Sequence, residues 1–248
     1  MGGGFVGSSV ASFFGGSNVY DKFKLMDPLE EVLKQELIFV CVPTPYENGF
    51  NRSALDDVFE KIGSINEPRI VVIKSTCVPG TTDYFQQKYQ HLKVLFNPEF
   101  LTQATAEQDF KNPDKQLVGY TSTSRDVSRS VLDMLPHAPY KKIMSAASTE
   151  LVKYAVNTFY ATKVVFGNML YDLCQSLGVD YNEVKEAFVS DQRIIDSHFD
   201  VLHGGYRGYG GKCLPKDLLA LVELGKKKGV DVGLLEKVDE MNQKYRTL

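Results

Sequence analysis

The sequence of 248 residues lacks an apolar run close to the roughly 20 residues that a membrane-spanning helix needs. It also lacks the basic segment followed by an apolar segment that a signal peptide would place near the N-terminus, where Gly and Ser stand instead. These absences argue against a membrane protein and against a secreted one. We therefore expect no membrane partner and a cytoplasmic location.

Cysteine and net charge are also scarce. Four cysteines are too few to form a disulfide framework in a chain of this length, and none stands in a C-x-x-C pair, so we expect free thiols and no metal. The formal net charge of −3 provides no general attraction for nucleic acid or anionic membranes. What remains is an ordinary globular composition, 43% hydrophobic and 24% charged.

Short apolar runs alternate with helix-like segments between residues 19 and 145. The expected strands are NVYD, ELIFVCV, RIVVIKS, KVLFNP and QLVGYT, and the expected helices are DPLEEVLK, SALDDVFEKI, TTDYFQQKY and SRDVSRSVLDML. This alternation predicts an α/β fold, a Rossmann-like doubly wound parallel sheet with helices on both faces. The nearly continuous apolar runs LIFVCV and IVVI are typical of central strands buried on both sides.

The second part of the sequence is helical. From Ser145 to Gly178 there is no proline and one internal glycine, and apolar residues recur at helical spacing, which predicts one long helix. Further helices are expected at 180–189, 218–228 and 234–245. We therefore predict two domains, a Rossmann-like domain over 1–145 and a mainly helical one over 146–248.

A glycine motif opens the chain. Gly2, Gly4 and Gly7 fit G-x-G-x-x-G and lead into a helical stretch, as in dinucleotide folds, where the backbone approaches a pyrophosphate at a helix N-terminus. Asp21 ends the expected strand NVYD, where an acidic residue holds the adenosine ribose. The alternative is a flexible glycine-rich terminus with a surface Asp, because the strand that should precede Gly2 cannot fit before Met1.

Three successive strands are expected to end in polar or proline-bearing loops, CVPTP, KSTCVPG and NPEFL. Ligands lie at the carboxyl ends of strands in open α/β sheets, so these ends favour a site, although each alone is more often a turn or a helix cap. The candidates facing a shared crevice are Thr44, Ser75, Thr76 and Glu99. On the long helix Lys153 and Asn157 are four apart and share a face, with a solvated Glu150–Lys153 pair as the alternative.

The loop RGYGGKCLPKD brings glycines directly before Cys213. Glycines let a substrate lie against the backbone and leave N–H groups free as donors. Near a helix start and Lys216, the pKa of Cys213 could be lowered, so that the thiolate acts as a nucleophile. For the other three cysteines we favour the alternative, a small apolar core residue.

In order, the motifs GGGFVG, VPTP, KSTCVPGTT, NPEFL, NPD, ELVKYAVNTFYATK, DQRI and GYGGKCLPKD resemble those of the UDP-glucose/GDP-mannose dehydrogenase family, over essentially the whole sequence. The resemblance implies an NAD-dependent, four-electron oxidation of a nucleotide sugar, UDP-glucose first, through a thiohemiacetal and a thioester of Cys213. It implies catalytic roles for Cys213, Lys153, Asn157, Asp217, Glu99 and Thr76. It implies NAD binding by Gly2, Gly4, Phe5, Val6, Gly7, Asp21, Val42, Pro43, Thr44, Ser75, Thr76 and Gln103. The substrate would contact Glu99, Phe100, Leu101, Lys153, Asn157, Arg193, Tyr209 and Gly210.

Three departures from the family pattern stand out. Gln103 replaces a common Glu, Ile195 replaces a glycine, and the chain stops where members continue into another α/β domain, so we expect a short form. A non-catalytic nucleotide-binding or assembly module is the alternative, but the joint presence of the six catalytic candidates favours the enzyme. A two-electron hydroxyacid dehydrogenase would need no cysteine. The broad apolar surface of the helix at 146–177 predicts a homodimer.

Overall fold

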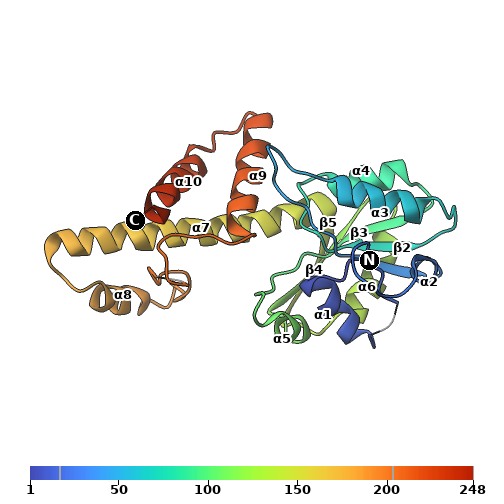
Figure 1. Ribbon diagram of the computed structural model, residues 1–248, viewed down its shortest axis with the longest axis horizontal. Helices are drawn as coiled ribbons and strands as arrows, with labels where there is room; N and C mark the ends of the chain where they lie inside the picture. The colour runs from blue at the N-terminus through green and yellow to red at the C-terminus, as the bar shows by residue number, and fades with distance from the viewer. Residues whose placement is uncertain (17, 203, 248) are drawn as a thin grey trace. The chain divides into compact units, whose positions relative to one another are not determined.

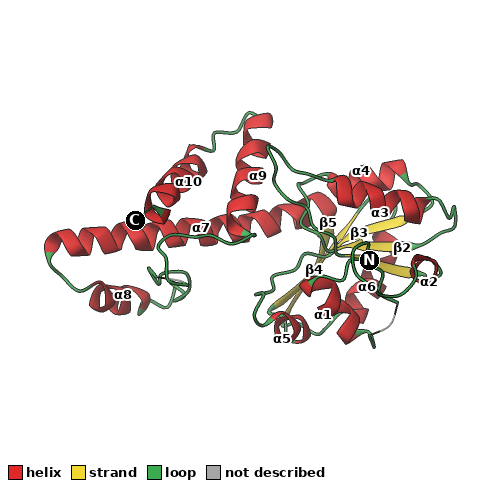
Figure 2. Cartoon of the chain, in the orientation of Figure 1, coloured by secondary structure: helices red, strands yellow, loops and turns green. Residues whose placement is uncertain are grey.

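The computed structural model describes residues 1–16, 18–202 and 204–247, so Leu248, the last residue of the predicted helical domain, lies outside these ranges. Two compact units are present, Met1–Lys153 and Tyr154–Leu248. In chain order the elements are α1 Phe5–Phe13, α2 Leu29–Leu33, β1 Leu37–Val40, α3 Ser53–Gly63, β2 Ile70–Ile73, α4 Thr81–Lys88, β3 Lys93–Phe96, α5 Ala106–Lys111, β4 Lys115–Tyr120, η1 Arg125–Val127, α6 Ser128–Met134, β5 Tyr140–Ser145, α7 Ala146–Leu177, α8 Tyr181–Val189, α9 Leu214–Lys227 and α10 Gly233–Arg246. Figures 1 and 2 show them. The predicted Rossmann-like α/β fold followed by a helical region with one long helix is confirmed.

The first unit holds a five-stranded sheet in the order β1-β2-β3-β4-β5. Three pairings are parallel, as predicted, but β3 and β4 are antiparallel and pair only through Leu95 with Tyr120 and Phe96 with Gly119. The cause is the connection between them, which contains the short helix α5 and returns the chain to the same end of the sheet that β3 left. The sheet is therefore mixed.

Alternation of apolar residues along the strands builds two cores on opposite faces of the sheet. In β2, Val71 and Ile73 pack with residues of α3 and α4, whereas Val72 packs in a second core with residues of α6. Figure 1 shows α3 and α4 side by side on one face. Burial on both faces explains the continuous apolar runs of these strands.

Four local features differ from the predictions. The segment NVYD is not a strand. A strand needs a ladder of backbone bonds to its neighbour, and the adjacent glycine loop gives this segment one bond, from the Gly2 N–H to the Tyr20 carbonyl at 2.8 Å. Strand β5 was missed because its exposed Lys141 and Lys142 hide the apolar pattern of a sheet-edge strand. Helix α5 was missed, and α9 begins four residues before the predicted Leu218.

The second unit is built from most of α7 together with α8, α9 and α10 (Figure 2). The 32 residues of α7 match the predicted long helix. Side chains of α7, α9 and α10 share one core, in which Val165, Leu218 and Val238 are buried. Within the described residues no helix is long and apolar enough to cross a membrane.

Candidate functional site

Two glycines of the N-terminal loop, Gly2 and Gly7, leave no room for a side chain, whereas Gly4 has open space. Gly2 has φ +93°, and a Cβ there would lie 2.4 Å from the Cys41 carbonyl oxygen, while one at Gly7 would lie 1.8 Å from the Gly2 oxygen. Gly4 is the N-cap of α1 and makes no side-chain cap bond. The first turn of α1 therefore presents N–H groups that can bind an anion such as a pyrophosphate.

Asp21 lies against this loop although no strand delivers it. Its Oδ2 accepts the Gly3 N–H at 2.7 Å and its Oδ1 accepts the Phe23 N–H at 2.9 Å. The bond from Gly3 is the main reason that the pKa of Asp21 is lowered, and Lys24, which also donates to the Gly3 carbonyl, adds to the effect. An ionised carboxylate beside a glycine loop fits the ribose of a dinucleotide.

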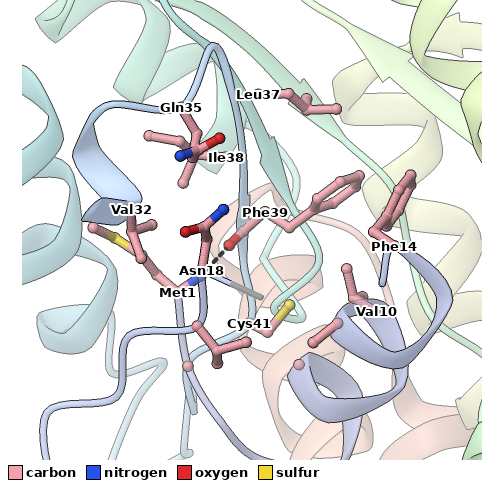
Figure 3. Close-up of a pocket in the computed structure, with 14 residues that line it drawn as sticks. Met1, Val10, Phe14, Asn18, Val32, Gln35, Leu37, Ile38, Phe39 and Cys41 are labelled. Carbon is pink, nitrogen blue, oxygen red and sulfur yellow. Dashed lines mark hydrogen bonds between the residues drawn. The ribbon is translucent and has the colours of Figure 1, made fainter. Parts of the chain in front are cut away.

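A cavity of about 210 Å³ lies between the glycine loop, α1 and β1 (Figure 3). Its wall is about equally polar and apolar and includes Val10, Phe14 and Phe39, and the Met1 amino group donates to the Phe39 carbonyl at 2.5 Å. Neither Asp21 nor the loops after β2 and β3 line this cavity. We therefore do not assign it to the cofactor.

The loops that follow β1 and β2 are joined by side chains that the sequence singled out. The Thr44 hydroxyl donates to the Thr76 carbonyl at 2.7 Å, and the Ser75 N–H donates to the Val40 carbonyl at 3.2 Å. The predicted NAD residues Val42, Pro43, Thr44, Ser75 and Thr76 thus belong to two neighbouring loops. Gln103 is exposed and lines an open hollow of about 620 Å³ with Ser8 and Ser9 of α1.

Glu99 and Lys153 form a buried ion pair in the first unit. The Lys153 Nζ lies 3.0 Å from Oε1 of Glu99 and donates to its backbone carbonyl at 2.7 Å. The other carboxylate oxygen accepts the Leu101 N–H at 2.8 Å, and the Phe100 ring lies 5.3 Å from the amine. This arrangement holds a possible proton acceptor and a possible oxyanion donor in defined positions.

Cys213, Asn157 and Asp217 come together in the second unit. Cys213 is exposed, is in no disulfide, and is the N-cap of α9. Its carbonyl accepts the Asp217 N–H at 3.0 Å. The buried Asp217 carboxylate accepts the Asn157 amide at 2.5 Å and the Lys216 ammonium at 2.5 Å. The backbone of Cys213 thus lies one helical turn before Asp217, at the N-terminus of α9, where the helix dipole favours a thiolate.

Two of the glycines before Cys213, Gly208 and Gly210, allow the loop to pack closely against α10. Gly208 has φ +72°, and a Cβ there would lie 2.5 Å from Oδ1 of Asn242, while one at Gly210 would lie 1.8 Å from Nη1 of Arg246. The Tyr209 side chain is buried, and its N–H and carbonyl both bond the Asn242 amide, at 2.7 and 3.0 Å. The structure thus packs two predicted substrate residues, Tyr209 and Gly210, against α10.

Asn242 was missed by sequence reasoning, because nothing local distinguishes it from the other polar residues of α10. Arg193 was singled out, but its side chain is 88% exposed and pairs with Asp191 at 2.5 Å, and it does not join the cluster at Asp217.

Among the residues that the structure describes, no group of three or more His, Cys, Asp or Glu could hold a metal ion.

Two family models match the chain. Residues 17–135 match the NAD binding domain of the UDP-glucose/GDP-mannose dehydrogenase family, and residues 147–244 match the central domain of the same family. Among curated proteins, a UDP-glucose 6-dehydrogenase of Rickettsia bellii is 32% identical over 229 residues, 88% of this chain and 52% of that protein. One of Pseudomonas aeruginosa is also 32% identical, over 88% of this chain and 51% of that protein.

The solved structures include a UDP-glucose dehydrogenase from Pyrobaculum islandicum with a TM-score of 0.78 and 31% identity. That likeness covers 87% of this chain and 52% of the archaeal one. The chain therefore spans about half the length of the relatives that it matches.

Proposed function

This chain belongs to the UDP-glucose/GDP-mannose dehydrogenase family, and on that premise we propose that it oxidises a nucleotide sugar, UDP-glucose first, at C6 to the uronate. The observation that carries the proposal is the pairing of the candidate catalytic side chains. Glu99 with Lys153 and Asn157 with Asp217 are buried, hydrogen-bonded pairs, and Cys213 stands exposed one turn before Asp217.

NAD is the cofactor of the matched family domain, and the residues of the first unit fit it. The N-terminus of α1 would hold the pyrophosphate, and Asp21 would accept hydrogen bonds from the ribose hydroxyls. Each NAD that binds would accept one hydride, so the oxidation of the alcohol to the acid would use two NAD molecules in succession.

The Cys213 thiol acts in the second half of the oxidation, after the C6 alcohol has been oxidised to an aldehyde. Its sulfur adds to the carbon of the sugar aldehyde, and the resulting thiohemiacetal is oxidised to a thioester, which water cleaves to release the uronate and restore the thiol. An exposed thiol at the N-terminus of α9 can be reached by such an aldehyde.

The paired side chains handle protons and negative charge. Glu99 takes a proton from the attacking water, which Thr76 helps to hold, while the Lys153 ammonium stabilises an oxyanion. The Asn157 amide can donate in the same way, because its orientation is fixed by its bond to Asp217. Arg193, Tyr209 and Gly210 remain proposed contacts of the nucleotide sugar.

The proposal extends to the organisation of the protein. Residues 1–145 would bind NAD, and 146–248 would form a catalytic and dimerisation domain in a cytoplasmic homodimer. The exposed apolar side chains of α7 support a dimer, since Phe159, Phe166 and Leu173 recur every seven residues and are 62%, 42% and 52% exposed. One face of a helix with this much apolar surface usually packs against another chain.

A substrate panel tests the reaction. NADH formation is followed with UDP-glucose, GDP-mannose, UDP-N-acetylglucosamine and UDP-N-acetylmannosamine, and complete turnover should give two NADH per sugar. No reduction with any of them, despite NAD binding, would favour the non-catalytic module.

Cys213→Ser tests the covalent step. A serine hydroxyl is a poorer nucleophile, and its ester a less reactive acyl group, so we expect the rate of uronate formation to fall by at least about a thousandfold. Cys174→Ser, in a separate core of the second unit, is the matched control and should keep the parent rate below its melting temperature. Uronate production by Cys213→Ser at the parent rate would exclude the thioester route.

A further inference from the structure

Lys74 is a buried lysine that the proposed reaction does not use. It directly follows β2, and its N–H donates to the Val40 carbonyl at 2.8 Å, one residue beyond the end of the strand. Its side chain is only 3% exposed. Lysine is rarely buried to this extent, because an ammonium loses its hydration, so a specific partner is expected.

The partner of the Lys74 ammonium is an amide. Its Nζ donates to Oδ1 of Asn97 at 2.5 Å and lies 3.4 Å from the Asn97 carbonyl oxygen, with the ring of Phe110 at 5.3 Å. In the described part of the chain no carboxylate lies within ion-pair distance of this amine. Burial lowers the pKa of Lys74 to about 8; Cys41 and Glu99 oppose the shift and Lys153 adds to it.

Asn97 is fully buried and is itself held on three sides. Its N–H donates to the Ile73 carbonyl at 2.9 Å, and its Nδ2 donates to the Leu117 carbonyl at 2.7 Å and to Oε1 of Gln116 at 3.2 Å. Because the Nδ2 bonds fix the orientation of the amide, its oxygen points at Lys74. The Lys74–Asn97 bond thus links the end of β2 to β4 across the short antiparallel junction.

The two residues stand at the start of two loops with catalytic candidates. Lys74 precedes Ser75 and Thr76, and Asn97 stands two residues before Glu99. An apolar side chain of similar length would fill the same space without desolvating an amine, so the particular contribution of Lys74 is a directional, charge-assisted bond. We propose that Lys74 is a positioning residue, whose bond to Asn97 fixes the loop of Thr76 relative to the loop of Glu99.

Hydrogen exchange measured by mass spectrometry tests the structural part without turnover. Lys74→Met and Asn97→Ser should each raise exchange in residues 75–80 and 97–103 by roughly tenfold, because the loops lose their common anchor. The double variant should exchange no faster than either single one, as expected for partners in one interaction. Lys93→Met, at the other end of the sheet, is the matched control and should leave both loops unchanged.

Parent-like exchange of either loop in Lys74→Met, or additive effects in the double variant, would overturn the proposal. If Lys74→Met does not fold, Asn97→Ser alone provides the comparison, because it also removes the acceptor of the Lys74 ammonium. Parent-like exchange of both loops in Asn97→Ser would then overturn the proposal.

The consequence for catalysis rests on the proposed function. Lys74→Met should lower kcat by about tenfold or more while the Kd for NAD stays unchanged, because misplaced Thr76 and Glu99 affect the chemical step. An unchanged kcat with an unchanged pH profile would contradict this role. A parent protein without activity would contradict the proposed reaction alone, since the exchange measurement needs no turnover.

Discussion

At the scale of single residues, Asp21 shows how a loop can replace a strand. The sequence places it at the end of an expected strand, but backbone N–H groups of Gly3 and Phe23 hold its carboxylate instead. These bonds favour the ionised form, which accounts for the lowered pKa. A carboxylate held beside the glycine loop is suited to discriminate between the two nicotinamide dinucleotides.

We predict that the protein binds NAD more tightly than NADP. Asp21 can accept bonds from a ribose 2′-hydroxyl and would repel a 2′-phosphate, although Lys22 and Lys24 reduce the repulsion. Asp21→Asn should lower the ratio of the two affinities by roughly tenfold, about 1.4 kcal/mol. Asp27→Asn is the control, and titration calorimetry with both dinucleotides is the measurement. Equal affinities in the parent would show that Asp21 has another role.

At the scale of elements, Glu150 links α7 to α4. Its Oε2 accepts the Gly80 N–H at 2.7 Å, and its Oε1 accepts the Thr82 N–H at 2.9 Å and the Thr82 hydroxyl at 2.6 Å. The N-terminus of α4 has no cap of its own, because Gly80 occupies that position. Burial nevertheless outweighs these donors and raises the pKa of Glu150 to about 7.

This raised pKa predicts a pH-dependent contribution to stability. Between pH 4.5 and 7 the unfolded chain loses the Glu150 proton while the folded protein keeps it, so this residue's contribution falls as the pH rises. Relative to Glu150→Gln, the parent should lose on the order of 3 kcal/mol of unfolding free energy across that interval. Urea unfolding followed by circular dichroism at several pH values measures the difference.

The exposed Glu107 provides the comparison for this prediction. Glu107→Gln removes a surface carboxylate that pairs with Lys111, and it should not reproduce the pH dependence over the same interval. A stability difference between the parent and Glu150→Gln that stays constant from pH 4.5 to 7 would mean that folding does not raise the pKa of Glu150.

At the scale of the whole molecule, we predict a homodimer formed along α7. Static light scattering should give the mass of two chains, and Phe166→Lys, which places a charge on the exposed apolar face, should weaken association by at least about tenfold. Phe23→Lys, at an exposed residue of the first unit, is the control. An active parent with only the monomer mass at every concentration would remove this proposal.

Local chemistry in the sequence determined the elements of this protein and many of its candidate residues. Helical spacing without proline specifies α7, continuous apolar runs specify β1 and β2, and glycines mark loops where a Cβ would meet a backbone oxygen, as at Gly2. These signals lie within a few neighbouring residues, so they can be read without knowing the fold. The family motifs are equally local.

Tertiary structure alone decided which buried polar groups meet. Asn157 and Asp217 are 60 residues apart, and Lys74 and Asn97 are 23 apart, and no local pattern pairs them. The direction of β4 beside β3 also depends on the tertiary structure, and so does the pairing of the charged edge strand β5 with β4. In both cases the neighbouring strand comes from another part of the chain. A buried amine or amide must find a partner, but its identity depends on the packing of the whole unit.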